Sequence, residues 1–146
     1  MRIVAVDPGG MCGLAEYVSG ANAFASWELP YLQAVQAVEA TAHDWLGIDL
    51  LVVERFDISP STLKKNMEGP MMTLDVIGGL RYVAYKERIK FEPQPQSARD
   101  VATPARLKKL GWYKPSKGGH RNSAASHLLA AALRHGVLDP KELVNA

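Results

Sequence analysis

An almost unbroken apolar run, IDLLVVERF at residues 48–56, decides the fold that this sequence can adopt. The run has the length of a β-strand, and it is apolar on both of the faces between which strand residues alternate. Strands of this kind are typical of sheets that carry helices on both faces, where neighbouring strands run parallel. We therefore predict a buried strand that lies parallel to the first strand of the chain and has Glu54 at its carboxyl end.

The segments before this run predict a three-stranded antiparallel meander and one helix. The apolar stretches RIVAVD, GLAEYV and AFASWEL begin at Arg2, Gly13 and Ala23, with Gly and Asn residues between them. After Pro30, which suits a helix start, residues 31–46 carry apolar side chains at helical spacing. The chain is therefore expected to open with three strands and an amphipathic helix.

The segments after the run alternate between helix and strand. Residues 69–88 predict a long helix, and IKFEPQ at residues 89–94 predicts a short strand. Residues 97–111 predict one or two short helices interrupted by Pro104, and an Ala/Leu-rich helix follows at residues 120–136. We predict an α/β fold: a five-stranded mixed sheet, with three antiparallel strands and then parallel strands, flanked by helices.

Length and composition bound the class of protein. A chain of 146 residues with 47% hydrophobic content is the size of one ordinary domain, so we expect a single domain over residues 1–146. The single cysteine, Cys12, cannot form an internal disulfide or complete a structural zinc set, which fits a reducing cytoplasm. No apolar run approaches the roughly 18 residues of a membrane span, and the short, charged start does not resemble a signal peptide. We expect a soluble cytoplasmic protein with no membrane partner.

Charge is segregated along the chain. Residues 1–54 contain one basic residue against seven acidic ones. Residues 81–121 contain eleven Lys and Arg residues against three acidic ones, a net charge of +8, with aromatic residues interleaved. Such a segment suits the neutralisation of nucleic-acid phosphates, and it equally suits a solvent-exposed helix face with incidental charge.

Two carboxylates are expected to meet at one edge of the sheet. Asp7 and Glu54 each end a strand, and parallel neighbours have their carboxyl ends at the same edge. Two carboxylates held together favour a cation, and with oxygen ligands the natural one is Mg²⁺ or Mn²⁺. Simpler explanations remain open: Asp7 precedes PGG and suits a turn, and Glu54 suits an exposed strand end.

Three segments together resemble a known family. IVAVDPGGMCGLAEY, LLVVERF and GGHRNSAASHLLAAAL are similar to segments of the RuvC-like Holliday junction resolvases, of the compact bacteriophage type, in the ribonuclease H-like superfamily. In that family the first strand ends in an aspartate, the fourth ends in a glutamate, and the last helix carries a His or Asp with a further Asp three residues later. The matching residues are Asp7, Glu54 and His120, while Ser123 stands where that further aspartate is expected. The resemblance covers most of the chain and implies a ribonuclease H-like fold.

The resemblance also implies a mechanism, which is hydrolysis of a DNA phosphodiester with two Mg²⁺ or Mn²⁺ ions in each subunit. Asp7 would bridge the ions, and Glu54 and His120 would complete the catalytic and metal-binding set. Ser123 would be a weak ligand, because a hydroxyl binds Mg²⁺ poorly beside a carboxylate. A four-way junction has two-fold symmetry, so a homodimer is the expected assembly, with residues 70–88 as the candidate interface.

One face of the last helix carries three polar residues. At about 100° per residue, His120, Ser123 and His127 lie within one stripe. His120 is expected to face the metal. Ser123 is either a ligand or a small residue that allows close packing, and His127 either reaches a phosphate or packs beneath the site.

Basic and aromatic residues near the loop before the last helix are the candidates for DNA contacts, because an aromatic ring in a basic loop can stack on an unpaired base. These candidates are Lys108, Lys109, Trp112, Tyr113, Lys114, Lys117, Arg121 and His127. Trp27 and Trp45 are expected in the core, and Asp75 is expected to face solvent.

The sequence therefore predicts a metal-dependent, structure-selective endonuclease that resolves Holliday junctions or other branched DNA by paired phosphodiester hydrolysis. The serine at position 123 leaves open a branched-DNA-binding protein with weak or no nuclease activity. A nuclease for flaps and forks is a further alternative. A sugar-kinase or actin-like phosphotransferase also opens with Asp-x-Gly after a strand, but such proteins need two domains of this kind.

Overall fold

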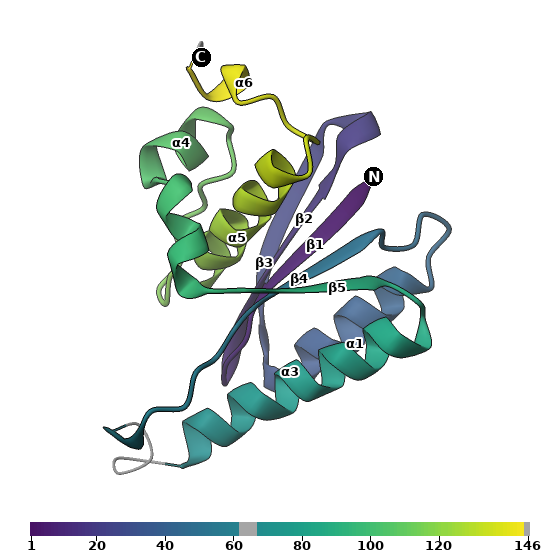
Figure 1. The fold of residues 1–146 in the computed structure, drawn as a ribbon, viewed down its shortest axis with the longest axis vertical. Coiled ribbons are helices and arrows are strands. Elements are labelled where there is room, and N and C mark those ends of the chain that lie inside the picture. The colour runs from purple at the N-terminus through teal and green to yellow at the C-terminus, as the bar shows by residue number, and fades with distance from the viewer. Residues whose placement is uncertain (62–66, 145–146) are drawn as a thin grey trace.

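Five strands form one mixed sheet in the order β3-β2-β1-β4-β5 (Figure 1). The structure, a computed structural model, describes residues 1–61 and 67–144. The antiparallel strands are β1 (Arg2–Asp7), β2 (Met11–Val18) and β3 (Ala23–Pro30). The strands parallel to β1 are β4 (Leu50–Glu54) and β5 (Lys90–Gln94). The predicted fold class is confirmed.

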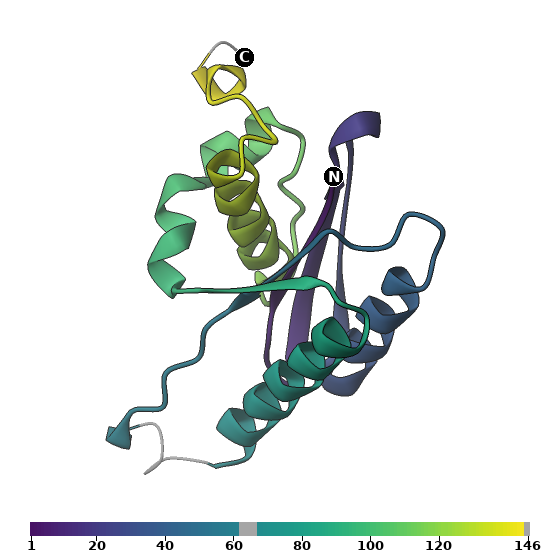
Figure 2. The same cartoon turned by 45° about the vertical axis from the view of Figure 1, so that its right-hand side comes forward.

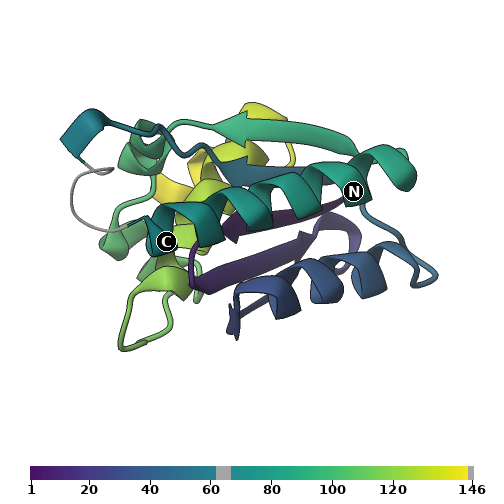
Figure 3. The ribbon, with the colours of Figure 1, turned by 90° about the horizontal axis from the view of Figure 1, so that it is seen from below.

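Helices cover both faces of this sheet. On one face lie α1 (Tyr31–Ala42) and α3 (Glu68–Lys86), side by side in the view from below (Figure 3). On the other lies α5 (His120–Arg134), with η2 (Gln96–Val101) beside it (Figures 1 and 2).

Three short helical segments complete the described elements: η1 (Ser19–Ala21), α4 (Pro104–Lys109) and α6 (Lys141–Val144). None of the helices in the described part of the chain combines the length and the apolar character that crossing a membrane requires.

The residues of β1 between Arg2 and Asp7 are all apolar because both faces of the strand are covered by helices. Ile3 and Ala5 pack with the residues of α5, whereas Val4 and Val6 pack with those of α1 and α3. β4 repeats this division between the two faces. A strand that is buried on both sides cannot alternate between apolar and polar residues, so the unbroken run in the sequence has a direct structural cause.

The amino end of β1 carries an ion-pair cluster around Arg2, which is only 8% exposed. Its Nη1 donates to Oδ2 of Asp44 at 2.6 Å, and its Nη2 donates to Oε2 of Glu16 at 2.9 Å. Its backbone N–H donates to Oδ2 of Asp49 at 2.6 Å. The hydrogen bond from Arg2 lowers the pKa of Asp44 below its usual value. The protein itself therefore neutralises the carboxylates at this end of the strand.

The first helix is shorter than the sequence predicts. α1 ends at Ala42 rather than at residue 46, and residues 43–46 form a turn. Trp45 lies in that turn and is 91% exposed, so the prediction that it belongs to the core is wrong. Trp27, the other tryptophan expected in the core, is partly buried and packs against it.

Candidate active site

Three polar side chains stand at the edge of the sheet where the parallel strands end. Asp7 ends β1, Glu54 ends β4 and Gln94 ends β5. The last paired residues of β1 and β4 are Val6 and Val53, so the two carboxylates that follow them are neighbours. Glu54 is in turn paired with Gln94 in the register of β4 and β5. The structure thus brings together the two carboxylates that the sequence predicts to meet, and adds an amide.

α5 presents three polar side chains to this edge. Nδ1 of His120 lies 3.2 Å from Oδ2 of Asp7. Oγ of Ser123 donates to Oε2 of Glu54 at 3.5 Å, and Nε2 of His127 lies 2.7 Å from the same oxygen. The helix face that spacing predicts is therefore the face that meets both carboxylates.

His127 is fully buried, with 0% of its surface exposed. Its Nδ1 lies 2.8 Å from Oε1 of Gln94, while its other ring nitrogen binds Glu54. The ring therefore packs beneath the site and fixes the position of Glu54. The predicted contact of His127 with DNA is wrong, because no part of the ring reaches the surface.

Gly13 allows α5 to begin directly against the sheet. It pairs with Asp7 across β1 and β2. A Cβ atom at Gly13 would lie 1.9 Å from the backbone oxygen of His120, far closer than any side chain tolerates. The absence of a side chain at Gly13 therefore sets how closely His120 approaches Asp7.

The two carboxylates differ in how readily they ionise. Burial raises the pKa of Asp7 above its usual value, and the charge of Glu54 raises it further. Burial also acts to raise the pKa of Glu54, but the hydrogen bond and charge of His127, with the charge of Arg99, outweigh it. The net pKa of Glu54 lies below its usual value. Glu54 is thus the readily ionised member of the pair.

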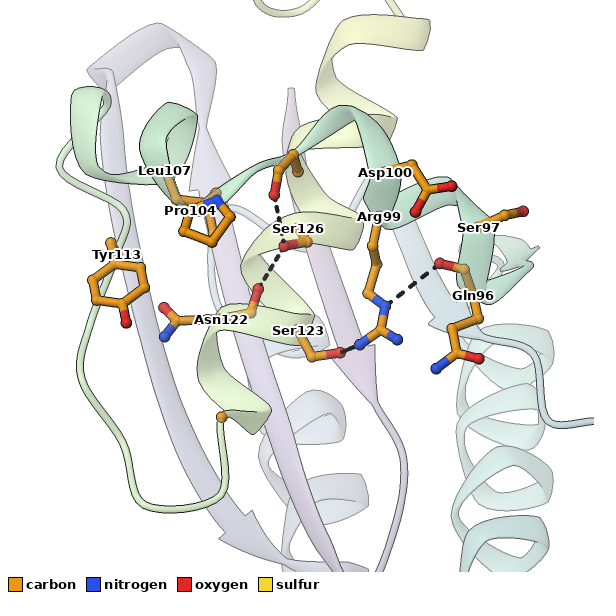
Figure 4. Close-up of a pocket in the computed structure, with 12 residues that line it drawn as sticks. Gln96, Ser97, Arg99, Asp100, Pro104, Leu107, Tyr113, Asn122, Ser123 and Ser126 are labelled. Atoms are coloured by element: carbon orange, nitrogen blue, oxygen red, sulfur yellow. Dashed lines mark hydrogen bonds between the residues drawn. The ribbon is translucent and has the colours of Figure 1, made fainter.

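Arg99, in η2, lies at this edge although no pattern in the sequence points to it. Its Nη1 donates to Oγ of Ser123 at 2.9 Å (Figure 4). Its Nε lies 3.8 Å from Oε2 of Glu54. Arg99 and Ser123 also line a cavity of about 580 Å³ between η2 and α5 (Figure 4). Arg99 follows β5 in an irregular segment, so neither strand ends nor helical spacing could have marked it.

Asp7 and Glu54 offer carboxylate oxygens of the kind that a divalent cation prefers. Two carboxylates repel each other there, and a cation with a preference for hard oxygen ligands relieves that repulsion. His120 contacts Asp7 directly, and among the residues that the structure describes no group of three or more His, Cys, Asp or Glu side chains is arranged to hold a metal ion. The fit does not extend to a second ion, because Ser123 offers only a hydroxyl and that hydroxyl binds Arg99.

The predicted DNA-contact residues differ in how free their side chains are. Lys114 and Lys117 are exposed. Nζ of Lys108 lies over the ring of Tyr113, 4.9 Å from its centroid. Lys109 instead donates to the backbone oxygen of Leu143.

Arg121 follows His120 in α5 and forms hydrogen bonds with residues of β3. Its guanidinium donates to the backbone oxygen of Ser26 and, at 3.4 Å, to the hydroxyl of the same residue. Its backbone N–H donates to Glu28 at 3.4 Å. Arg121 therefore helps to fasten the start of α5 to the sheet.

Trp112 belongs to the core, and its predicted contact with a DNA base is wrong. Gly111, with φ of +71°, reverses the chain after α4, and the backbone N–H of Trp112 donates to the oxygen of Leu107 at 2.8 Å. The indole, 4% exposed, lies 4.7 Å from the ring of Phe24 and 5.1 Å from the ring of Tyr17, between centroids. This is a Schellman helix end, in which the residue after glycine packs back on the helix, and the Gly-Trp pair could have signalled it.

The chain resembles solved resolvases in structure far more than in sequence. No protein-family model matches the chain, and no curated protein sequence matches it. Thermus thermophilus RuvC in complex with a Holliday junction substrate matches with a TM-score of 0.68 and 14% sequence identity, over 94% of this chain and 98% of that chain. The fold is that of RuvC. A second Thermus thermophilus RuvC structure matches with a TM-score of 0.61 and 17% identity, again over 94% of this chain and 98% of that chain.

The RuvC fold extends to a viral protein. The fowlpox virus Holliday junction resolvase matches with a TM-score of 0.53 and 13% identity, over 94% of this chain and 100% of that chain. The ribonuclease H-like fold that the resemblance implied is therefore confirmed. At identities of 13% to 17% the likeness to RuvC establishes the fold, and the chemistry has to be argued from the side chains at the sheet edge.

Proposed function

We propose that this protein is a metal-dependent, structure-selective endodeoxyribonuclease that resolves Holliday junctions or other branched DNA by paired phosphodiester hydrolysis. The observation that carries the proposal is the Asp7–Glu54 pair at the edge of a RuvC-type sheet, with His120 3.2 Å from Asp7. Carboxylates and an imidazole are donors that suit Mn²⁺, and the carboxylates suit Mg²⁺.

Each side chain of the site has a role that follows from its contacts. Asp7 and Glu54 would hold the divalent cation, which supplies positive charge to the phosphate and makes a bound water more acidic. His120, which contacts Asp7 in the structure, is the proposed third ligand. His127 orients Glu54 through the 2.7 Å hydrogen bond, and Gln94 holds the imidazole from behind. These two residues act through Glu54 and are positioning residues.

DNA binding is assigned to the basic segment that precedes and begins α5. Lys114 and Lys117 are exposed and suit contacts with phosphates, which would make binding dependent on salt concentration. The remaining candidates for this surface are Lys108, Lys109, Tyr113 and Arg121.

A homodimer suits this function, because a four-way junction has two-fold symmetry and needs two nicks. α3 carries an exposed apolar stripe, the α3 stripe, which consists of Met71, Leu74, Tyr82 and Tyr85, exposed by 55%, 41%, 64% and 83%. At about 100° per residue these four residues lie on one side of the helix, while Val76, Leu80 and Val83 are buried. Asp75 beside the stripe is exposed, as predicted.

A branched-DNA-binding protein with little nuclease activity is the second candidate. It is favoured by Ser123, whose hydroxyl is bound to Arg99 and is no substitute for a carboxylate ligand. The two candidates share a DNA-binding surface and differ in catalysis.

Cleavage of synthetic branched DNA tests the proposal. A labelled four-way junction, a flap, a fork and a linear duplex are incubated with the protein in Mn²⁺, in Mg²⁺ and in EDTA. The expected result is paired nicks in opposite strands of the junction, only with the metal. Tight junction binding without cleavage in either metal would establish the second candidate instead.

The dimer is tested separately by substituting Leu74→Ser and Tyr85→Ser together. These changes remove apolar surface from the α3 stripe, and the molar mass from light scattering should fall from dimer to monomer. Trp45→Ser is the matched control, because Trp45 is 91% exposed and lies outside α3. A wild-type protein that is monomeric at all concentrations would exclude this interface.

A further inference from the structure

The positively charged side chain of Arg99 faces both Glu54 and Ser123. Nη1 of Arg99 donates to Oγ of Ser123 at 2.9 Å, and Nε lies 3.8 Å from Oε2 of Glu54. Nε also donates to the backbone oxygen of Gln96 at 3.4 Å, which anchors the side chain within its own segment. The guanidinium is therefore held at the site by contacts from two directions, while the side chain as a whole remains 31% exposed.

A second divalent ion and Arg99 compete for the same space. A magnesium ion bound to Oγ of Ser123 would lie about 2.1 Å from that oxygen. Nη1 of Arg99 lies 2.9 Å from the same oxygen, so the ion and the guanidinium would be no more than about 5 Å apart. Like charges at that separation oppose each other strongly, and a hydroxyl gives the ion no negative charge in return.

We propose that Arg99 takes the place of a second divalent ion: each subunit binds one ion, at the Asp7–Glu54 pair, and the Arg99 guanidinium binds the scissile phosphate. The phosphate part of this inference rests on the proposed function. Ser123 and Arg99 then form a matched pair, because the hydroxyl accepts from Arg99 and donates towards Glu54. An aspartate at position 123 would pair with Arg99 and draw its charge away from the DNA.

The remaining hydrogen-bond capacity of Arg99 suits a phosphate. Of its five N–H groups, two donate to the oxygens of Gln96 and Ser123 among the described residues. The others can bind two phosphate oxygens in the planar, bidentate manner that arginine favours. The adjoining cavity of about 580 Å³ leaves room beside the guanidinium for a phosphate group (Figure 4).

Arg99 acts in this scheme as a fixed charge. The oxygen of water forms a bond to phosphorus as the bond from phosphorus to the 3′ oxygen breaks, which leaves a 5′ phosphate and a 3′ hydroxyl. The attacking water releases one proton to solvent, and the leaving 3′ oxygen takes one up. Arginine stays protonated throughout, so Arg99 opposes the negative charge on the non-bridging oxygens and transfers no proton.

Counting bound ions tests the first half of the inference without DNA and without cleavage. Mn²⁺ is titrated calorimetrically into the wild type, Ser123→Asp, Arg99→Ala and the Arg99→Ala/Ser123→Asp double variant, each as the whole chain. One ion per subunit is expected for the first three, and two for the double variant, because only there does a carboxylate stand free of the guanidinium. Two ions or none in the wild type would overturn the proposal, and that count requires no variant to fold.

The double variant also shows whether Arg99 or Ser123 is the reason that a second ion does not bind. If the folded double variant, checked by circular dichroism, still binds one ion, the arginine does not exclude the second ion and the proposal fails. If Ser123→Asp alone binds two ions, a carboxylate suffices despite Arg99, and the proposal fails as well.

The salt dependence of junction binding tests the phosphate contact. Removing one phosphate contact reduces the slope of log affinity against log salt by about 0.9, so Arg99→Ala should flatten the slope by about that amount for each subunit bound. Arg134→Ala is the matched control, because it also removes one positive charge. Arg134 lies in α5, eleven residues beyond Ser123 and roughly 16 Å along the helix, and it pairs with Glu92. An Arg99→Ala slope equal to those of the wild type and the control would overturn the contact.

The number of bound Mn²⁺ ions and the salt dependence of binding can both be measured whether or not the protein cleaves DNA. If the wild type cleaves junctions, Arg99→Ala should reduce single-turnover cleavage about 100-fold, and Arg99→Lys should recover part of that rate as a point charge without the planar fork. If the wild type binds one Mn²⁺ ion and junction DNA but never cleaves, the proposed function fails while the role of Arg99 in charge and binding holds.

Discussion

The two ends of β1 both gather charged side chains, yet they are built in opposite ways. At the amino end Arg2 binds Glu16 at 2.9 Å and Asp44 at 2.6 Å, so the carboxylates are neutralised within the protein. At the carboxyl end Asp7 lies beside another carboxylate, and burial together with the charge of Glu54 raises its pKa.

The difference separates a cluster that stabilises the fold from one that is suited to a ligand. The Arg2 cluster needs nothing from outside, because opposite charges are paired in place. The Asp7 end keeps two like charges together at a cost in stability, which is a common property of sites that bind and react. A substitution that removes charge should therefore have opposite effects on stability at the two ends.

Asp7→Asn is expected to have the largest effect. Single-turnover junction cleavage should fall about 1000-fold or more, equivalent to roughly 4 kcal/mol of activation barrier, because an amide is a poor ligand for a divalent cation. Junction affinity should stay unchanged or increase, and the thermal midpoint near neutral pH should rise, since a buried charge beside Glu54 is removed. Cleavage at the wild-type rate would exclude Asp7 from the site.

The pH dependence of stability provides a second test of the same variant. The pKa of Asp7 is raised by burial and by Glu54, so between the usual and the raised value the folded protein holds more protons than the unfolded chain. Wild-type stability should therefore lose the contribution of Asp7 as pH rises through that window. The advantage of Asp7→Asn in urea unfolding should grow over the same window and then stay constant.

Glu54 contributes with the opposite sign. Its pKa is lowered, because the contacts of His127 and Arg99 outweigh burial, so it stabilises the fold above its usual pKa. That contribution disappears as pH falls through the lowered value. A Glu54→Gln variant should thus lose less stability than the wild type on acidification.

Gly13→Ala should have the next largest effect. A Cβ atom at this position would lie 1.9 Å from the backbone oxygen of His120, so the start of α5 must move away from Asp7. A displacement of about 1 Å at a reacting group can reduce a rate about 100-fold, and cleavage should fall by that order. Stability should fall as well, as measured by urea unfolding.

The same substitution at Gly69 is the control. Gly69 lies in the first turn of α3, outside the α3 stripe; it is exposed, and a methyl group at this position would have no neighbouring atom within 4 Å. Gly69→Ala should leave the free energy of unfolding unchanged or raise it by up to roughly 1 kcal/mol, because alanine restricts the unfolded chain and favours the helix. Equal effects of the two substitutions would show that close contact at Gly13 does not position α5.

Arg2→Gln examines the other end of the strand. It leaves Glu16 and Asp44 without their cation, and the free energy of unfolding should fall by roughly 1–3 kcal/mol, since the cluster is only partly buried. The number of Mn²⁺ ions bound per subunit should not change. A gain in stability like that expected for Asp7→Asn would mean that the two ends do not differ as their contacts indicate.

Replacing Lys114 and Lys117 together with alanine should have the smallest effect, and only on DNA binding. Both side chains are exposed, and junction affinity at fixed salt should fall about 10-fold, with a slope against salt lower by about 0.9 for each phosphate that is no longer bound. Lys109→Ala, whose ammonium group already binds the backbone of Leu143, should change affinity less. A salt slope that does not change in the double variant would exclude this surface.

Strand ends are the most informative feature of the sequence. Asp7 and Glu54 can be paired from the sequence because both end strands expected to be parallel, and Gln94 could have been added by the same rule. Two of the three tryptophans show where the sequence pattern misleads. Trp45 falls within a predicted helix that in fact ends earlier, and Trp112 has basic neighbours that suggest DNA contact, although the glycine before it turns the ring into the core.

Arg99 shows the limit of such reasoning more sharply. Its contacts with Ser123 and Glu54 depend on how η2 packs against α5, and no local periodicity encodes that packing. The sequence shows that Ser123 stands where an aspartate is expected, but it does not show that Arg99 binds this serine. The residues that depart from expectation are those whose neighbours are set by tertiary structure alone.

The contacts that build the candidate site join distant parts of the chain, which has a consequence for folding kinetics. His120 and Asp7 are 113 positions apart, and His127 and Glu54 are 73 apart. Contacts of such long range require large loops to close before any interaction is gained, so they form late. In a refolding experiment, strand and helix signals should therefore recover before the ability to bind Mn²⁺, and α5 should be the last element to dock.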